Sequence, residues 1–482
     1  MPESPSPSPL SDPPDVGELV AVVAEQRVLI AVLQARVAEL EARLGKHSGN
    51  SSKPPSSDNR FTKAPPRSLR GKSGRRPGKQ PGAPGSGLAP RVPDRREVHV
   101  PDLCGGCGED LSAAEVLGEQ RRQVFDLPAI RYEVTEHVVQ TRRCGCGRES
   151  TAAFPAMAKA PTCYGPRISA LAAYLLARQH VPVARVAEML ADLTGLPTST
   201  GWLATLLPHA QARLAGFAEL TRDLLQEAPV VSFDETGARV QGALWWVHVA
   251  CTDQLTSYHR ASGRGKDSMD LGEVLPGFAG TAVHDGLTSY RKYPVTHQLC
   301  NAHHLRELVG LIETHQRTGK TPLAWPQAMI DLLVEINTAV VTARAAGRTC
   351  LDKDLLAGYH TRYQGVIAAG KAAHPPPPPT GKQGRPKLGT AGSLLRRLDI
   401  YQTDVLRFAT DFTVPFDNNQ AERDLRMIRL QQKISGCWRT EAGADAFLAV
   451  RSYLATARKQ QANALEVLTG LFTGNTWLPA PT

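Results

Sequence analysis

Residues 230–236 have the sequence Val-Val-Ser-Phe-Asp-Glu-Thr, in which a short and mostly apolar run precedes two acids. Such a run is typical of a buried strand, so we predict a strand that ends at Asp234. The residues after it predict, in order, strands over 244–250 and 255–259, a helix over about 266–275, and strands over 281–284 and 296–300. Because crossover connections are right-handed, the first and fourth strands should be parallel neighbours.

A second acid, Asp285, directly follows the fourth predicted strand, 51 positions after Asp234. Open α/β sheets keep their sites at the carboxyl ends of strands, so we expect the two carboxylates to lie side by side. Two such charges need a cation between them, and Mg²⁺ prefers carboxylate oxygens. Taken singly, Asp234 could instead cap a turn with Thr236, and Asp285-Gly286 could be an ordinary turn.

A third acid, Glu422, lies far along the chain, in the sequence Phe-Asp-Asn-Asn-Gln-Ala-Glu-Arg-Asp-Leu-Arg at 416–426. This stretch predicts a helix that begins at an Asp or Asn cap. Glu422, Arg426 and Arg429 are spaced by four and three and therefore share one helix face. That face could hold a metal ion beside phosphates; a solvated helix with a Glu–Arg pair is the alternative.

A heptad pattern lies near the N-terminus, where mostly apolar residues recur at alternating steps of four and three between Leu19 and Leu44. Val23, Ile30 and Val37 alternate in it with leucines, which favours a parallel two-stranded coiled coil. We therefore expect at least a dimer. A single amphipathic helix that lies on its own chain is the alternative.

Two close cysteine pairs follow, separated by 36 residues and each succeeded by glycine. They are Cys104 with Cys107 and Cys144 with Cys146. Their spacing predicts a structural four-cysteine zinc ribbon, with a strand over 131–139 between the pairs. The second pair is one residue shorter than usual, so His137 could replace one thiolate, and thiols without metal are a further alternative.

The positive charge is concentrated in residues 46–96, which contain thirteen Lys or Arg and two acids, whereas the whole chain has a formal net charge of +10. This segment is also rich in Pro, Gly and Ser, so we expect a disordered basic arm. A polybasic arm attracts phosphates, and Arg75, Arg76 and Lys79 could lie in a minor groove. An inert linker is the alternative.

Composition also excludes several classes of protein. No apolar stretch is long enough to span a membrane, the N-terminal residues do not resemble a secretory signal, and nine scattered cysteines do not suggest a disulfide scaffold. We therefore expect a reduced cytoplasmic protein.

The order strand-Asp, strand-Asp, helix-Glu resembles the ribonuclease H-like core of DDE transposases. Several strings in this sequence, in the same order, are similar to those of insertion-sequence family 66 transposases. They are Asn50–Asp58, Tyr164–Arg167, Phe233–Thr236, His284–Gly286, Cys300–His303 and Asp417–Arg423. The resemblance extends from the heptads to about Phe472.

This resemblance implies a multidomain α+α/β chain with a ribonuclease H-like mixed-sheet catalytic core. With the patterns above, it predicts a coiled-coil helix (17–45), the disordered basic arm (46–96), a zinc-ribbon-like DNA-binding module (97–155), a helical domain with a helix-turn-helix outline or a plain helical hairpin (164–226), the core (227–440) with a helical insertion at about 305–411, and a C-terminal helical region (441–474).

The resemblance also implies an activity. Asp234, Asp285 and Glu422 would hold two Mg²⁺ ions, one of which activates water to cut DNA at the ends of a mobile element, and the freed 3′-hydroxyl would then attack target DNA. His303, Arg423, Arg426 and Arg429 would contact DNA, although a buried structural role for His303 is the alternative. Expected partners are the element's terminal repeats, target DNA, a second copy of the chain and small accessory proteins of the same element.

The expected location is the bacterial cytoplasm, in association with the nucleoid. Two rival functions remain open at this stage. One is a structure-selective nuclease on the same core, which would cut DNA without joining it. The other is a dimeric DNA-binding regulator whose core has lost catalysis.

Overall fold

The computed structural model describes residues 16–45, 82, 88–317, 321–375 and 388–481. The chain divides into two units, of which one contains Ser68–Glu136 with Leu190–Pro197 and the other contains the remaining residues. The predicted contacts Arg75, Arg76 and Lys79 lie outside the described residues, as does most of the basic arm. Within the described ranges, no helix is both long and apolar enough to cross a bilayer.

The larger unit contains a five-stranded mixed sheet with the strand order β5-β4-β3-β6-β7. Its strands are β3 (Val230–Val240), β4 (Ala243–Cys251), β5 (Thr256–Ala261), β6 (Thr281–His284) and β7 (Thr296–Leu299). Strands β3, β4 and β5 form an antiparallel meander, and β6 lies parallel to both β3 and β7. The predicted meander, crossover and parallel neighbours are therefore confirmed.

Two boundaries differ from the prediction. Strand β3 does not end at Asp234 but continues to Val240, because residues 234–240 pair with β4. The crossover helix α6 (Lys266–Asp270) is shorter than predicted, and the positive φ of 56° at Glu273 excludes a helix that continues to residue 275.

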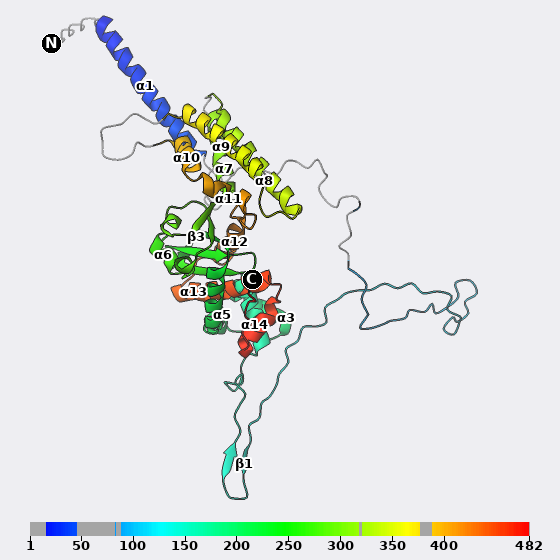
Figure 1. The fold of residues 1–482 in the computed structure, drawn as a ribbon. Coiled ribbons are helices and arrows are strands. Elements are labelled where there is room, and N and C mark those ends of the chain that lie inside the picture. The colour runs from blue at the N-terminus through cyan, green and yellow to red at the C-terminus, as the bar shows by residue number, and fades with distance from the viewer. Residues whose placement is uncertain (1–15, 46–81, 83–87, 318–320, 376–387, 482) are drawn as a thin grey trace, which may run out of the picture. The chain divides into compact units, whose positions relative to one another are not determined.

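Helices cover both faces of the sheet. On one face, α12 (Asn419–Ser435) and α13 (Glu441–Lys459) share an apolar core with residues of β3, β4 and β5. On the other face, α5 (Ala215–Glu227) and the crossover segment pack against β3 and β6. Figure 1 shows α12 beside β3, so a helix from the C-terminal third lies against the central strand.

The predicted helical insertion is present and has a hydrophobic core of its own. It consists of α7 (Asn301–Arg317), α8 (Ala324–Ala345), α9 (Lys353–Ala373), α10 (Thr390–Ile400) and α11 (Gln402–Thr410). It begins four residues earlier than predicted, because α7 follows β7 with a single residue between them. Most of the proline-rich segment between α9 and α10 lies outside the described residues.

The other predicted helices also form. They are α1 (Val16–Leu44), α2 (Pro166–Ala173) continued by a π-helical turn (Tyr174–Arg178), α3 (Val183–Thr194), α4 (Thr200–Gln211) and α14 (Ala464–Thr473). Ser199 caps α4, and its hydroxyl accepts a hydrogen bond from the Trp202 N–H.

The predicted strand over 131–139 is wrong. The nearby hairpin is formed instead by β1 (Thr141–Arg143) and β2 (Glu149–Thr151), on either side of the second cysteine pair. Residues 131–139 alternate in polarity, but the side chains of Tyr132, Val134 and Val138 are exposed. Among the described residues no strand pairs with this segment and no apolar layer lies against it, and alternation alone does not form a sheet.

Candidate active site

Asp234 and Glu235 are consecutive residues of β3, so their side chains point to opposite faces of the sheet. Asp234 shares its face with Ala238 and Val240, which belong to the core formed with α12 and α13. Glu235 shares its face with Phe233, which packs on the other side. The alternation therefore directs Asp234 toward the helix that carries Glu422.

Asp285 lies beside Asp234 through the parallel pairing of β3 and β6. Ser232 is paired with Val283, and two further residues along each strand lead to Asp234 and Asp285. The Asp285 carboxylate also accepts a hydrogen bond of 2.9 Å from the Leu287 N–H, and Gly286 has a φ of +96°. Asp285-Gly286 is thus both a turn and part of the acidic site.

Glu422 is brought to the sheet by a set of bonds around Asn418. The Asn418 side chain donates a 2.8 Å hydrogen bond to the Phe233 carbonyl at the end of the β3–β6 pairing. Its backbone N–H donates to the Cys300 sulfur at 3.2 Å. Asn418 therefore caps α12 by position but makes no side-chain cap bond, because its amide holds the helix to β3 instead. Glu422 lies one turn further along.

The three predicted acids influence one another electrostatically. Burial raises the pKa of Asp234 well above its usual range, and the negative charges of Glu235, Asp285 and Glu422 raise it further. Such repulsion requires short separations, since charges interact weakly through water. These influences agree with the predicted convergence of Asp234, Asp285 and Glu422, which stays a prediction. A cation would relieve this repulsion, and all the converging donor atoms are oxygens.

Glu235 is a fourth acid of the site that the sequence reasoning did not single out. Its carboxylate is buried and accepts hydrogen bonds from the Tyr290 hydroxyl at 2.9 Å and from Arg264 at 3.5 Å. Burial, with the charge of Asp285, raises the pKa of Glu235 to about 7. The available signal was its position in a buried strand, directly after an acid.

Replacing Glu235 with Gln should stabilise the metal-free protein above pH 7 and leave its stability nearly unchanged near pH 5. An acid whose pKa is raised on folding costs stability when ionised, and that cost disappears as the pH falls from about 7 toward the unfolded value of 4.5. Thermal unfolding in EDTA at pH 5 and pH 8.5 would measure this. We expect Tm to rise by roughly 2–4 °C at the higher pH only.

An equal change in the Tm of Glu235→Gln at both pH values would contradict the assignment of a raised pKa to Glu235. Glu227→Gln is the matched control, because Glu227 is an exposed residue that ends α5 outside the acidic site. Its Tm difference from the unmodified chain should not depend on pH.

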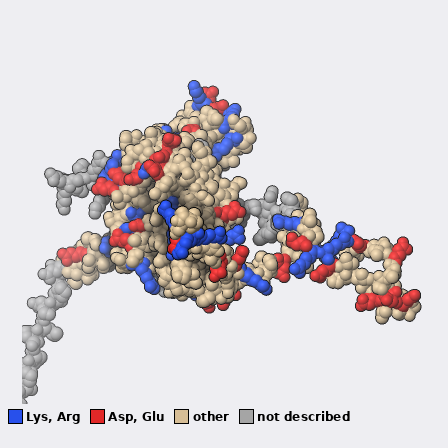
Figure 2. Space-filling view, turned by 90° about the horizontal axis from the view of Figure 1, so that it is seen from below, with Lys and Arg blue, Asp and Glu red and all other residues tan. Residues whose placement is uncertain are grey.

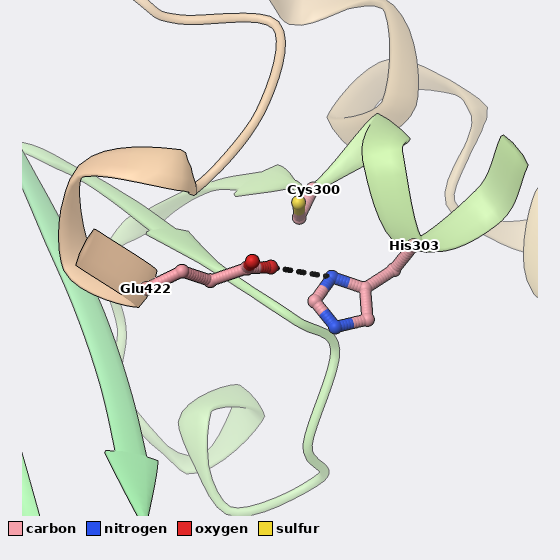
Figure 3. Close-up of side chains that lie close together, drawn as sticks. All are labelled: Cys300, His303 and Glu422. Carbon is pink, nitrogen blue, oxygen red and sulfur yellow. Dashed lines mark ion pairs between the residues drawn. The ribbon is translucent and has the colours of Figure 1, made fainter. Parts of the chain in front are cut away.

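Cys300 and His303 lie beside Glu422, and one potential ligand atom from each of the three residues lies within 4.8 Å of the others. Figure 3 shows Glu422 reaching from α12 toward the His303 ring, with the Cys300 sulfur nearby. Burial raises the pKa of Cys300 to about 12, and its sulfur accepts the Asn418 N–H. Those properties suit a thiol that fixes the start of α12 better than a thiolate that binds metal.

The predicted DNA contacts are in different environments. His303 is mostly buried, and burial with the charge of Arg306 lowers its pKa, so the imidazole is neutral at pH 7. Arg423 and Arg426 are exposed on α12. Arg429 points to the sheet and donates a 2.8 Å hydrogen bond to the Thr236 hydroxyl.

Each cysteine pair forms a tight turn within its own unit. In the first, the Gly108 N–H donates to the Cys104 carbonyl, and Gly108 has a φ of +78°. In the second, the Gly147 N–H donates to the Cys144 carbonyl, and Gly147 has a φ of +89°. The left-handed glycine closes both turns in the same way.

Backbone N–H groups in these turns point at sulfur. Hydrogen bonds from the Cys107 and Gly106 amides lower the pKa of Cys104 to about 7, and the Cys146 amide lowers the pKa of Cys144. Thiolates bind zinc, so each turn taken by itself suits a pair of zinc ligands. The shortened second pair forms a turn comparable to the first, with the same glycine-closed geometry.

Comparison with protein families gives three matches. Residues 161–446 match the model of the transposase IS66 family. Residues 101–147, which include all four cysteines, match the zinc-finger binding domain of transposase IS66. Residues 9–89 match a family of unknown function, DUF6444. No curated protein matches the chain.

Proposed function

Because this chain belongs to the IS66 family of transposases, we propose that it binds the ends of a mobile DNA element and catalyses metal-dependent strand cleavage and strand transfer there. Asp234, Asp285 and Glu422 are the proposed catalytic residues. The observation that carries the proposal is that β3 and β6 are parallel neighbours and that Asn418 holds the start of α12 to β3, while the charges of Asp285 and Glu422 both raise the pKa of Asp234.

The proposed core is ribonuclease H-like. Supporting this, the sheet begins with a three-stranded antiparallel meander, and a crossover returns the chain to a strand parallel to the first. The first acid lies on the first strand, the second directly follows the fourth strand, and the third lies on a helix against the first strand.

Two Mg²⁺ ions are the proposed cofactors, held by the oxygens of Asp234, Asp285 and Glu422. Bound divalent ions at such a site polarise the phosphodiester and favour the deprotonated form of the attacking water or 3′-hydroxyl. The chain's own contribution is to hold three carboxylates at one place. Asn418 keeps the third of them there by tying α12 to the Phe233 carbonyl.

End recognition is assigned to the zinc-finger domain and the basic arm. Apart from residues 46–96, the chain has almost no net charge. On the face shown in Figure 2, blue and red side chains are interspersed over a mainly uncharged central surface. Because non-specific DNA binding depends on phosphate neutralisation, the arm is the segment suited to supply it.

The test is a joining assay with the full chain, Mg²⁺, a labelled element end and a second duplex. A transposase yields products in which the two duplexes are covalently linked. A nuclease yields only cut ends, and a DNA-binding regulator yields neither. Absence of linked product with the element's authentic ends would overturn the proposed function.

We expect the chain to dimerise through α1, on which the heptad residues are exposed. Leu19, Val23, Ile30, Leu33, Val37 and Leu40 are each 43–55% exposed. An uncovered apolar seam of this length favours pairing with a second copy.

Ile30→Asp should convert the dimer to a monomer and weaken association about 10²-fold or more, because each helix of the coiled coil would then bury a charged carboxylate. Sedimentation equilibrium would measure the mass. Val28→Asp is the matched control, since Val28 lies off the seam on the same helix, and it should remain dimeric. An Ile30→Asp protein that stays dimeric would exclude the seam as the interface.

A further inference from the structure

Arg306 of α7 forms an ion pair with the acid contributed by α12. Its Nη2 atom lies 2.8 Å from Oε1 of Glu422, and its Nε atom donates to the Ala302 carbonyl at 3.2 Å. The side chains of Arg306 and Glu422 are only 19% and 27% exposed. Partial burial makes this contact stronger than a typical surface ion pair.

The pair occupies an oxygen of Glu422 that the proposed metal site needs. A guanidinium and a divalent cation both seek the same carboxylate, and their positive charges repel each other at short range. Arg306 and a metal ion therefore compete for Glu422.

Arg306 is well placed to contact DNA once it leaves Glu422. Its side chain is partly exposed and projects from the first turns of α7, beside Glu422. A guanidinium binds phosphate oxygens through paired hydrogen bonds. Arg429, by contrast, is held by the Thr236 hydroxyl on the sheet.

We propose that Arg306 neutralises Glu422 in the metal-free protein and transfers to a phosphate of the bound DNA strand when divalent metal binds. In the metal-free protein, the pairing of Arg306 with Glu422 reduces the repulsion among the acids. With DNA bound, Arg306 is a substrate-binding residue of the same site. This inference rests on the proposed function, because it assumes that Glu422 binds the catalytic metal.

The first test measures Mn²⁺ binding to the full chain by electron paramagnetic resonance, without DNA. Arg306→Gln should bind Mn²⁺ about three- to tenfold more tightly, because the competing cation is gone. Arg306→Lys should stay close to the unmodified affinity, because it keeps the charge. Unchanged or weaker Mn²⁺ binding by Arg306→Gln would overturn the proposal.

The second test measures DNA cleavage at saturating Mn²⁺. Arg306→Gln should cut the element end at least tenfold more slowly, and its DNA binding should depend less steeply on salt by about one phosphate contact. A merely structural Arg306 would leave the salt slope unchanged. We therefore expect Arg306→Gln to bind metal more tightly and yet cleave DNA more slowly. Cleavage by Arg306→Gln at the rate of the unmodified chain would also overturn the proposal.

Arg260→Gln is the matched control. Arg260 is also largely buried and paired with carboxylates, at Asp445 and Glu441, but contacts none of the three acids. It should change neither Mn²⁺ affinity nor the salt slope. If Asp234→Asn leaves wild-type Mn²⁺ affinity intact, the metal site itself is misplaced, and that failure concerns the proposed function rather than Arg306.

Discussion

Asp234→Asn should abolish strand cleavage and joining, with a fall of about 10³-fold or more, because loss of a ligand removes several kcal/mol of transition-state stabilisation. The same substitution should raise Tm in EDTA. Asp234 is ionised at neutral pH only at a cost, since burial and the neighbouring acids raise its pKa. Asn removes that charge and keeps the shape. Cleavage assays and thermal unfolding would measure the two effects.

Added Mg²⁺ should change the Tm of the unmodified chain and of Asp234→Asn differently. It should stabilise the unmodified chain by binding only the folded state and have little effect on Asp234→Asn. Binding to element ends should persist in both. Asp253→Asn, which changes an exposed aspartate in the β4–β5 turn, is the control and should cleave normally. Residual joining by Asp234→Asn close to the normal rate would remove Asp234 from the site.

The second large effect concerns the cysteine turns. Cys107→Ser should lose bound zinc and weaken binding to element ends about 10²-fold or more, because structural zinc supplies much of the folding energy of small modules. Elemental analysis would measure zinc, and a gel-shift titration would measure binding. The five-stranded sheet of the larger unit should be unaffected, since no residue of the turn belongs to it.

Cys350→Ser provides the comparison, because Cys350 is an exposed thiol in the helical insertion. It should retain both zinc and affinity for the ends. A Cys107→Ser protein that keeps its zinc would show that the ion is not held by this pair of turns. A protein that loses zinc but binds ends normally would instead separate the metal from DNA recognition.

Much of the site was predictable because it depends on local patterns and one topological rule. Short apolar runs fixed the strands, and crossover handedness made β3 and β6 neighbours, which places Asp234 beside Asp285. The start of α12 followed from its Asp and Asn residues. These features need no knowledge of distant contacts.

The remaining features depend on contacts between distant residues. Glu235 becomes part of the site only because Tyr290, 55 positions later, donates to it. Arg306 and Glu422 are 116 positions apart, and nothing in their spacing indicates a pair. The strand expected over 131–139 was wrong for a related reason, because alternation does not reveal whether a partner strand exists.

The bonds around Asn418 also have a consequence for how this chain can change over evolutionary time. The Asn301 N–H donates to the Phe416 carbonyl, so the helical insertion leaves the core and returns to it at one point. Helices α8 and α9 can therefore be lengthened, trimmed or exchanged between relatives with little disturbance to the core, provided that this junction, the first turns of α7 and the contact of α11 with β7 are kept.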